Sequence, residues 1–178
     1  MTAQSGLVRA WKRFMQGIRA IFAFALPVDQ AAAADILSPE LYDLFCRMRR
    51  SEQIHSLRMM TALRDAGHDQ PDLLVAALLH DVGKSRYRLT LIDRVLIVLV
   101  KYGTPKVFAQ WSAGDAVGWR RRFVIGAKHA AWSAEDMADA GASVLAASLA
   151  RRHMDEIDTV ASEEDRLLLL LMQADDEH

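Results

Sequence analysis

Histidine and aspartate residues occur in this chain on helix faces that otherwise carry aliphatic side chains. His80 follows Leu73 by seven residues and Ala76 by four, and Asp175 follows Leu171 by four. Burying an imidazole or a carboxylate without a partner costs roughly 2–7 kcal/mol. The acidic and imidazole positions that need such a partner are spread over roughly 120 residues: His55, His80, Asp81, His129, His153 and Asp175. Because cations suit both kinds of ligand, we interpret the six residues as one metal centre that folding must assemble.

The spacing of apolar and capping residues predicts an all-α protein. Glycine and proline are sparse, at 9 and 4 of 178 residues, which disfavours a turn-rich β architecture. Helices are expected over residues 39–49, 51–66, 72–81, 89–101, 120–138, 142–153 and 163–175, with a looser connecting region from Gly103 to Gly118. We therefore predict a single-domain helical bundle with the metal site between helices. N-terminal helices in residues 1–50 are expected to pack on the domain of residues 51–178, which contains the six candidate ligands.

The beginning of the chain predicts a basic amphipathic helix over residues 7–25. Its apolar residues recur at helical spacing, and no acidic residue precedes Asp29. Such a helix either packs on the domain or adsorbs to a membrane surface. Arg19 interrupts the apolar run that a signal peptide would need. Cys46 is the only cysteine, so the sequence predicts no intrachain disulfide and favours a cytoplasmic location.

Charge is distributed unevenly along the chain. Residues 82–128 contain 10 basic and 2 acidic residues, whereas residues 129–178 contain 3 basic and 12 acidic ones. The middle of the chain is thus suited to anionic ligands. Lys84, three residues after Asp81, is either a phosphate contact or a lysine that caps its helix. Further candidates for substrate contacts, which are equally consistent with solvated surface positions, are Arg86, Lys128, Arg151 and Arg152.

The residues around His80 resemble a known family. The segment Ala-Leu-Leu-His-Asp-Val-Gly-Lys at residues 77–84, with His55 before it and Gln-Ala-Asp ending at Asp175, is similar to the HD-domain superfamily of metal-dependent phosphohydrolases. The resemblance covers residues 50–178 and implies an all-α bundle with metals held between helices. It implies His55, His80, Asp81 and Asp175 as ligands of a first ion. His129 and His153 match the extra histidines of the subset that binds two ions, in which Asp81 bridges them.

The resemblance also implies a reaction. A metal-activated water would cleave a small phosphate ester or a nucleotide, with Asp81 and Lys84 as the catalytic residues and two divalent ions of iron, manganese, zinc or magnesium as cofactors. A di-iron oxygenase with the same ligands and a non-catalytic metal-binding regulatory module are the alternatives. His129 is followed by Ala-Ala-Trp rather than by Gly-Tyr-Pro, which disfavours a cyclic-dinucleotide phosphodiesterase of the HD-GYP type. Arg120, Arg121 and Arg122 lack the interleaved aromatic residues typical of nucleic-acid binding, so we expect a small-molecule partner.

Overall fold

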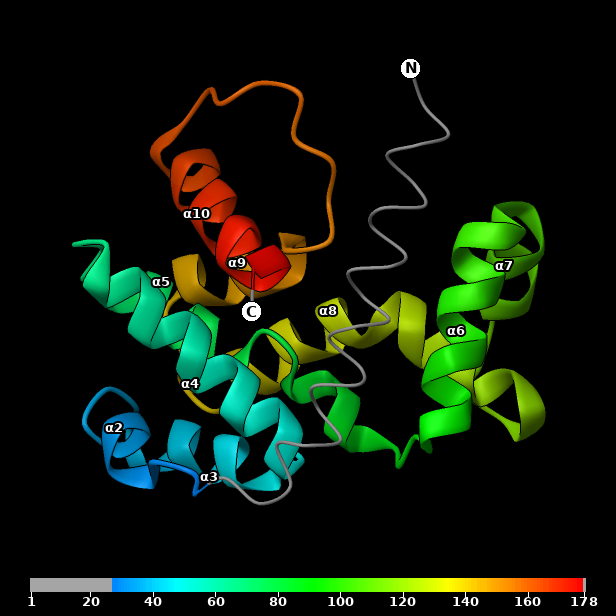
Figure 1. Cartoon of the computed structure of the whole chain (residues 1–178), viewed down its shortest axis with the longest axis horizontal. Coiled ribbons are helices and arrows are strands. Elements are labelled where there is room, and N and C mark those ends of the chain that lie inside the picture. The colour runs from blue at the N-terminus through cyan, green and yellow to red at the C-terminus, as the bar shows by residue number, and fades with distance from the viewer. Residues whose placement is uncertain (1–26, 178) are drawn as a thin grey trace.

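The computed structural model describes residues 27–177, and every regular element in this range is a helix (Figure 1). This confirms the predicted all-α fold. The elements are α2 (Gln30–Ala34), α3 (Pro39–Arg47), α4 (Arg50–Asp65), α5 (Pro71–Leu79), the 3-10 helix η2 (Val82–Arg86), α6 (Leu91–Gly103), α7 (Pro105–Ser112), the 3-10 helix η3 (Gly118–Arg120), α8 (Arg121–Asp139), α9 (Val144–Arg152) and α10 (Glu163–Glu177). The amphipathic helix predicted over residues 7–25 lies outside the described residues.

Short polar residues and proline set the helix boundaries. Ser38 Oγ accepts a hydrogen bond from the Leu41 N–H at 3.3 Å, and Pro39 occupies the first helical position of α3. Thr90 Oγ1 caps α6 in the same way, accepting from the Asp93 N–H at 3.2 Å. These local rules explain why most predicted helix boundaries lie within a few residues of the observed ones.

The main hydrophobic core is built from helices on both sides of α5. Its fully buried side chains include one from each of α3, α4, α5, α9 and α10: Phe45, Met59, Leu78, Leu149 and Leu168. Residues of α3 thus share the core of the helices that follow, and the proposed boundary at residue 50 falls at the first residue of α4. α6 and α7 lie at the other end of the molecule from α9 and α10 (Figure 1).

The prediction of a loose connection from Gly103 to Gly118 is wrong for Pro105–Ser112, because these residues form the helix α7. Isolated helices of this length are marginal in water, so tertiary contacts must stabilise it. The rings of Phe108 and Trp111 lie 6.3 and 5.0 Å from the ring of Phe123 on α8. The Arg120 guanidinium also donates to the carbonyls of Gln110 and Ala113 at the end of α7, at 2.7 and 2.9 Å.

Within residues 27–177, no helix is both long enough and apolar enough to cross a lipid bilayer.

Candidate metal centre

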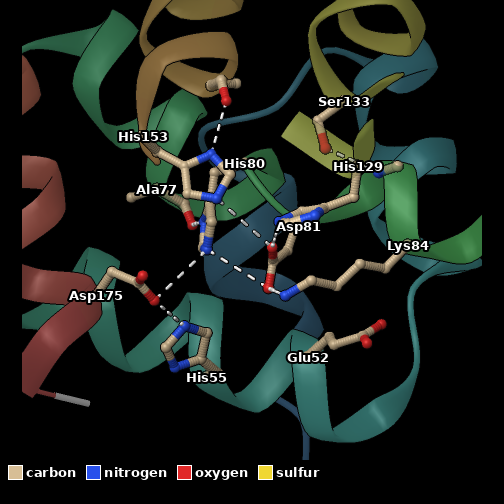
Figure 2. A network of polar contacts seen from close by, with 12 residues as sticks. Glu52, His55, Ala77, His80, Asp81, Lys84, His129, Ser133, His153 and Asp175 are labelled. Atoms are coloured by element: carbon tan, nitrogen blue, oxygen red, sulfur yellow. Dashed lines mark hydrogen bonds and ion pairs between the residues drawn. The ribbon is translucent and has the colours of Figure 1, made fainter. Parts of the chain in front are cut away.

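Side chains from five separate helical regions converge on one buried cluster (Figure 2). The contributing regions are α4, the end of α5, α8, the end of α9 and α10, which supply in order His55, His80 with Asp81, His129, His153 and Asp175. All except His55 are buried. The structure therefore brings together every residue that the sequence analysis proposed as a ligand.

The first group of ligand atoms lies between α4, α5 and α10. Asp175 Oδ1 is 3.0 Å from His55 Nε2 and 3.9 Å from His80 Nε2. These three residues form a set that could hold one metal ion. His80 Nε2 is also 3.6 Å from Asp81 Oδ2, which adds a second carboxylate to the edge of this group.

The second group surrounds the other oxygen of Asp81. Asp81 Oδ1 is 3.4 Å from His129 Nε2 and 3.9 Å from His153 Nε2. His80, Asp81 and His153 also form a set with the spacing that an ion needs. The two oxygens of the Asp81 carboxylate thus lie nearest to different imidazole nitrogens.

Three of the histidines have their rings oriented by a local hydrogen bond. The Nδ1 atoms of His80, His129 and His153 lie 3.1, 3.0 and 2.7 Å from backbone carbonyls one turn earlier in the chain. A carbonyl can only accept, so Nδ1 carries the proton and Nε2 keeps its lone pair. Metal-ligating histidines are usually held by this kind of contact to their other nitrogen.

Burial keeps these imidazoles neutral. Loss of solvation lowers the pKa of His153 to about 4, with a further contribution from neighbouring His80. Loss of solvation and the charge of Lys84 hold the pKa of His129 well below its usual value. Burial also lowers the pKa of His80. All three rings can therefore act as ligands at neutral pH without first losing a proton.

Asp81 stays ionised in the same environment. Burial acts to raise its pKa, but the positive charge of Lys84, together with the nearby imidazoles, holds it well below the usual value. Lys84 Nζ donates to Asp81 Oδ2 at 2.5 Å, from the 3-10 helix that directly follows the aspartate.

The cluster fits a cation because two of its buried acceptors lack a hydrogen-bond donor. His80 Nε2 and Asp81 Oδ1 are both inaccessible to solvent and have no partner. Leaving such atoms unsatisfied costs roughly 1–3 kcal/mol each. Ligands about 2.1 Å from a shared ion lie roughly 3.0–3.4 Å apart. The 3.4 Å contact of His129 with Asp81 matches this spacing, the 3.0 Å contact of His55 with Asp175 is also a hydrogen bond, and the remaining contacts are 3.6 and 3.9 Å.

Gly83 allows the segment that carries Lys84 to lie directly against α8. The Gly83 N–H donates to Ser133 Oγ at 2.8 Å. A Cβ atom at Gly83 would lie 2.3 Å from the His129 carbonyl oxygen and 2.7 Å from the Ser133 nitrogen. This close approach joins Asp81 and Lys84 to the helix that bears His129.

The other proposed substrate contacts fall in two places. Arg86 and Lys128 both line a surface pocket of about 470 Å³, together with Trp132. The Arg86 guanidinium lies 5.5 Å from the centre of the Trp132 ring and donates to Asp136 at 2.6 Å. Lys128 Nζ donates to the Gly114 carbonyl at 2.8 Å.

Arg152 instead connects α9 to the start of α10. Its guanidinium donates to Glu164 Oε1 and to Asp165 Oδ1, at 2.7 Å in both cases. Both carboxylates contribute to a raised pKa of Arg152, as expected for a strongly paired cation. These contacts offer a structural role beside the predicted one in substrate binding.

Replacing Arg152 with alanine distinguishes a structural role in pairing α9 with α10 from a role in substrate binding. If the ion pairs dominate, the melting temperature falls while KM for the substrate stays within about twofold. The exposed Arg47 serves as the control, since its replacement by alanine should leave both quantities unchanged. A large increase in KM at an unchanged melting temperature would instead favour substrate binding.

Glu52 is a buried acid near the centre that the sequence analysis missed. It lies one turn before His55 on α4, is 5 % exposed, and accepts a hydrogen bond from Arg94 of α6 at 2.5 Å. Its spacing of three residues from His55 was the available signal. Its partner on α6 could not be foreseen, because that contact depends on how the two helices meet.

Comparison with known protein families identifies the family to which this chain belongs. The profile of the HD domain matches residues 53–178, which include all six proposed ligands. Searches among curated proteins and among solved structures gave no match. HD domains bind divalent metals and generally act as metal-dependent hydrolases. The match covers well over half of the sequence and starts at the helix that carries His55, so the chain belongs to the HD-domain family.

Proposed function

We propose that the protein is a metal-dependent phosphohydrolase that cleaves a small phosphate ester or a nucleotide. The observation that carries the proposal is the pair of buried acceptors, His80 Nε2 and Asp81 Oδ1, inside a cluster of four imidazoles and two carboxylates. In this proposal His55, His80, Asp81 and Asp175 hold one divalent ion. His129 and His153 hold a second, with Asp81 between them.

The residues of the chain prepare the centre for this chemistry. Divalent ions bound there would supply a water of lowered pKa and polarise the phosphoryl oxygens. The backbone carbonyls orient the Nε2 atoms of His80, His129 and His153 toward the centre. Asp81 remains a carboxylate because the Lys84 ammonium donates to it and lowers its pKa.

Lys84 is placed to bind the phosphate. Its side chain is 27 % exposed and that of His55 is 22 %, whereas the Asp81 side chain is only 7 % exposed. A substrate therefore approaches the buried carboxylate from the side of Lys84 and His55 (Figure 2). An ion bound to Asp81 would compete with the ammonium for the same oxygen and leave Lys84 able to donate to a phosphoryl oxygen.

The contacts of the three consecutive arginines, Arg120 to Arg122, favour a small substrate over a nucleic acid. Arg120 and Arg121 donate to backbone carbonyls, and Arg122 pairs with Asp93 at 2.8 Å. These guanidinium groups thus already have partners within the fold.

Replacing His129 with alanine is expected to reduce the bound metal from two ions to one. The contact at 3.4 Å from His129 to Asp81 Oδ1 belongs to the second group, so the ligands of the first group remain in place. Elemental analysis of the purified variant measures the change. His68, which lies outside the cluster, provides a matched control, and its alanine variant should keep two ions. Unchanged metal content in the His129 variant would contradict the two-group assignment.

Phosphate release tests the reaction itself. Protein loaded separately with manganese, zinc, magnesium or iron is incubated with nucleotides, phosphomonoesters and phosphodiesters. We expect release with at least one class of substrate. If no class reacts and the iron-loaded protein consumes oxygen after anaerobic purification, the di-iron oxygenase replaces the proposal. If neither reaction occurs while metal is bound, the centre is a non-catalytic module.

A further inference from the structure

The helix α6 is rich in aliphatic residues and yet contributes none to the core. Its sequence, LIDRVLIVLVKYG, contains eight aliphatic residues, and all seven whose side chains are described are at least partly exposed. None of them belongs to the main hydrophobic core. Ile97 faces α8, where a Cβ at Gly126 would lie 2.9 Å from its Cγ2 atom. Residues 27–177 leave the opposite side of the helix exposed.

The uncovered residues form one continuous line, which we name the α6 stripe. It consists of Ile92, Val95, Leu99 and Tyr102, with exposed fractions of 70, 38, 62 and 40 %. Positions separated by three, four and three residues lie on one face of a helix. Contiguous apolar surface of this kind marks an interaction site.

The charge around the α6 stripe is positive. α6 and α7 hold the basic residues Arg94, Lys101 and Lys106 and one acidic residue, Asp93; Arg94 pairs with Glu52, and Asp93 is bound by Arg122 of α8. Lys101 and Lys106 lie on α6 and α7 themselves, and Lys101 Nζ is 6.0 Å from the centre of the Tyr102 ring.

The positive charge beside the α6 stripe favours a negatively charged partner surface over a positively charged one. A second copy would bring the same cationic face against itself. Residues 1–26 carry four basic residues and no acidic residue, so they also repel this region. An anionic lipid surface matches both properties, because apolar side chains enter the boundary of the acyl chains while lysine and arginine contact the headgroups.

We propose that the α6 stripe and the cations beside it dock the protein on an anionic membrane surface. Tyr102 and Lys101, at the end of the stripe, suit the headgroup level, where amphipathic side chains are favoured. α6 packs mainly on α7 and α8, on the side of the molecule away from α10 (Figure 1). The docking is independent of the reaction proposed for the metal centre.

Co-sedimentation of the full chain with vesicles tests the proposal. Wild-type protein should bind vesicles of phosphatidylcholine mixed with phosphatidylglycerol, and bind pure phosphatidylcholine far more weakly. The double variant Ile92→Glu with Leu99→Glu should lose roughly tenfold or more in its partition onto the mixed vesicles. A double variant with the same change in charge at the other end of the molecule, Val144→Glu with Val160→Glu, replaces residues that are 89 and 52 % exposed and should stay within about threefold of wild type.

Circular dichroism verifies that each variant is folded, and Leu99→Ser gives a milder version that should also weaken binding if the double variant fails to fold. Three results would overturn the proposal. The first is a wild-type protein that binds neither kind of vesicle. The second is a stripe variant that binds as tightly as wild type, including the case in which only deletion of residues 1–26 removes binding. The third is a wild-type dimer, measured by light scattering, that the stripe variant dissociates, without any vesicle binding.

Discussion

Replacing Asp81 with asparagine is expected to weaken the binding of both ions and to lower the rate of phosphate release by on the order of a thousandfold or more, about 4 kcal/mol at the barrier. The effect is large because the two oxygens serve different groups. Oδ2 lies 3.6 Å from His80 Nε2, and Oδ1 lies 3.4 Å from His129 Nε2. An amide has the same shape but only one oxygen and no charge, so it cannot serve both groups.

The measurement combines elemental analysis with steady-state kinetics on the metal-loaded variant. Asp158→Asn removes the same charge at an exposed position away from the cluster and should leave both the metal content and the rate unchanged. Circular dichroism separates loss of the ions from loss of the fold. An asparagine variant that still holds two ions and turns over at a rate close to wild type would show that Asp81 does not bridge the groups.

Replacing Gly83 with alanine should destabilise the fold by roughly 2–3 kcal/mol or more and weaken metal binding with it. The added Cβ would lie 2.3 Å from the His129 carbonyl oxygen, 2.7 Å from the Ser133 nitrogen and 2.9 Å from Trp132 Cβ. Two of these atoms are backbone and the third is attached to it, so none can move by rotating a side chain. Relief requires η2 to move away from α8, which separates Asp81 from His129.

Urea denaturation of the metal-free protein measures the loss of stability, and titration with metal measures the loss of affinity. Gly103→Ala is the matched control, since no atom lies within 4 Å of a Cβ built at Gly103 and its backbone is not in the left-handed region. That variant should remain within about 0.5 kcal/mol of wild type. Equal stabilities for the two alanine variants would mean that η2 and α8 are not in tight contact.

The helices and the ligand candidates could be predicted because they depend on local rules. Ser38 caps α3 through a neighbour three residues away, and α4 ends at Asp65, one residue before the predicted end. His80 was identifiable because an imidazole on an aliphatic face needs a partner. Even its orienting contact to the Ala77 carbonyl is local, since the two residues are one helical turn apart.

The surroundings of those ligands could not be predicted in the same way. The pairing of Arg152 with Glu164 and Asp165 joins two helices, and so does the contact between Arg94 and Glu52. α7 is short enough that tertiary contacts decide its structure, among them those of its aromatic rings with Phe123 and the hydrogen bonds from Arg120. Each of these depends on the distance and angle between elements, which apolar spacing along one helix does not specify.

The chain by itself therefore determined that this protein is helical, which residues are suited to hold metal, and to which family it is similar, because helix periodicity and ligand chemistry are properties of short segments. Only the tertiary structure decided that the two oxygens of Asp81 face different groups of histidines, that Gly83 lies against α8, and that one face of α6 stays uncovered. The physical reason is that each of these features is a distance between residues far apart in the sequence. Such distances follow from how the helices pack against one another around the shared core.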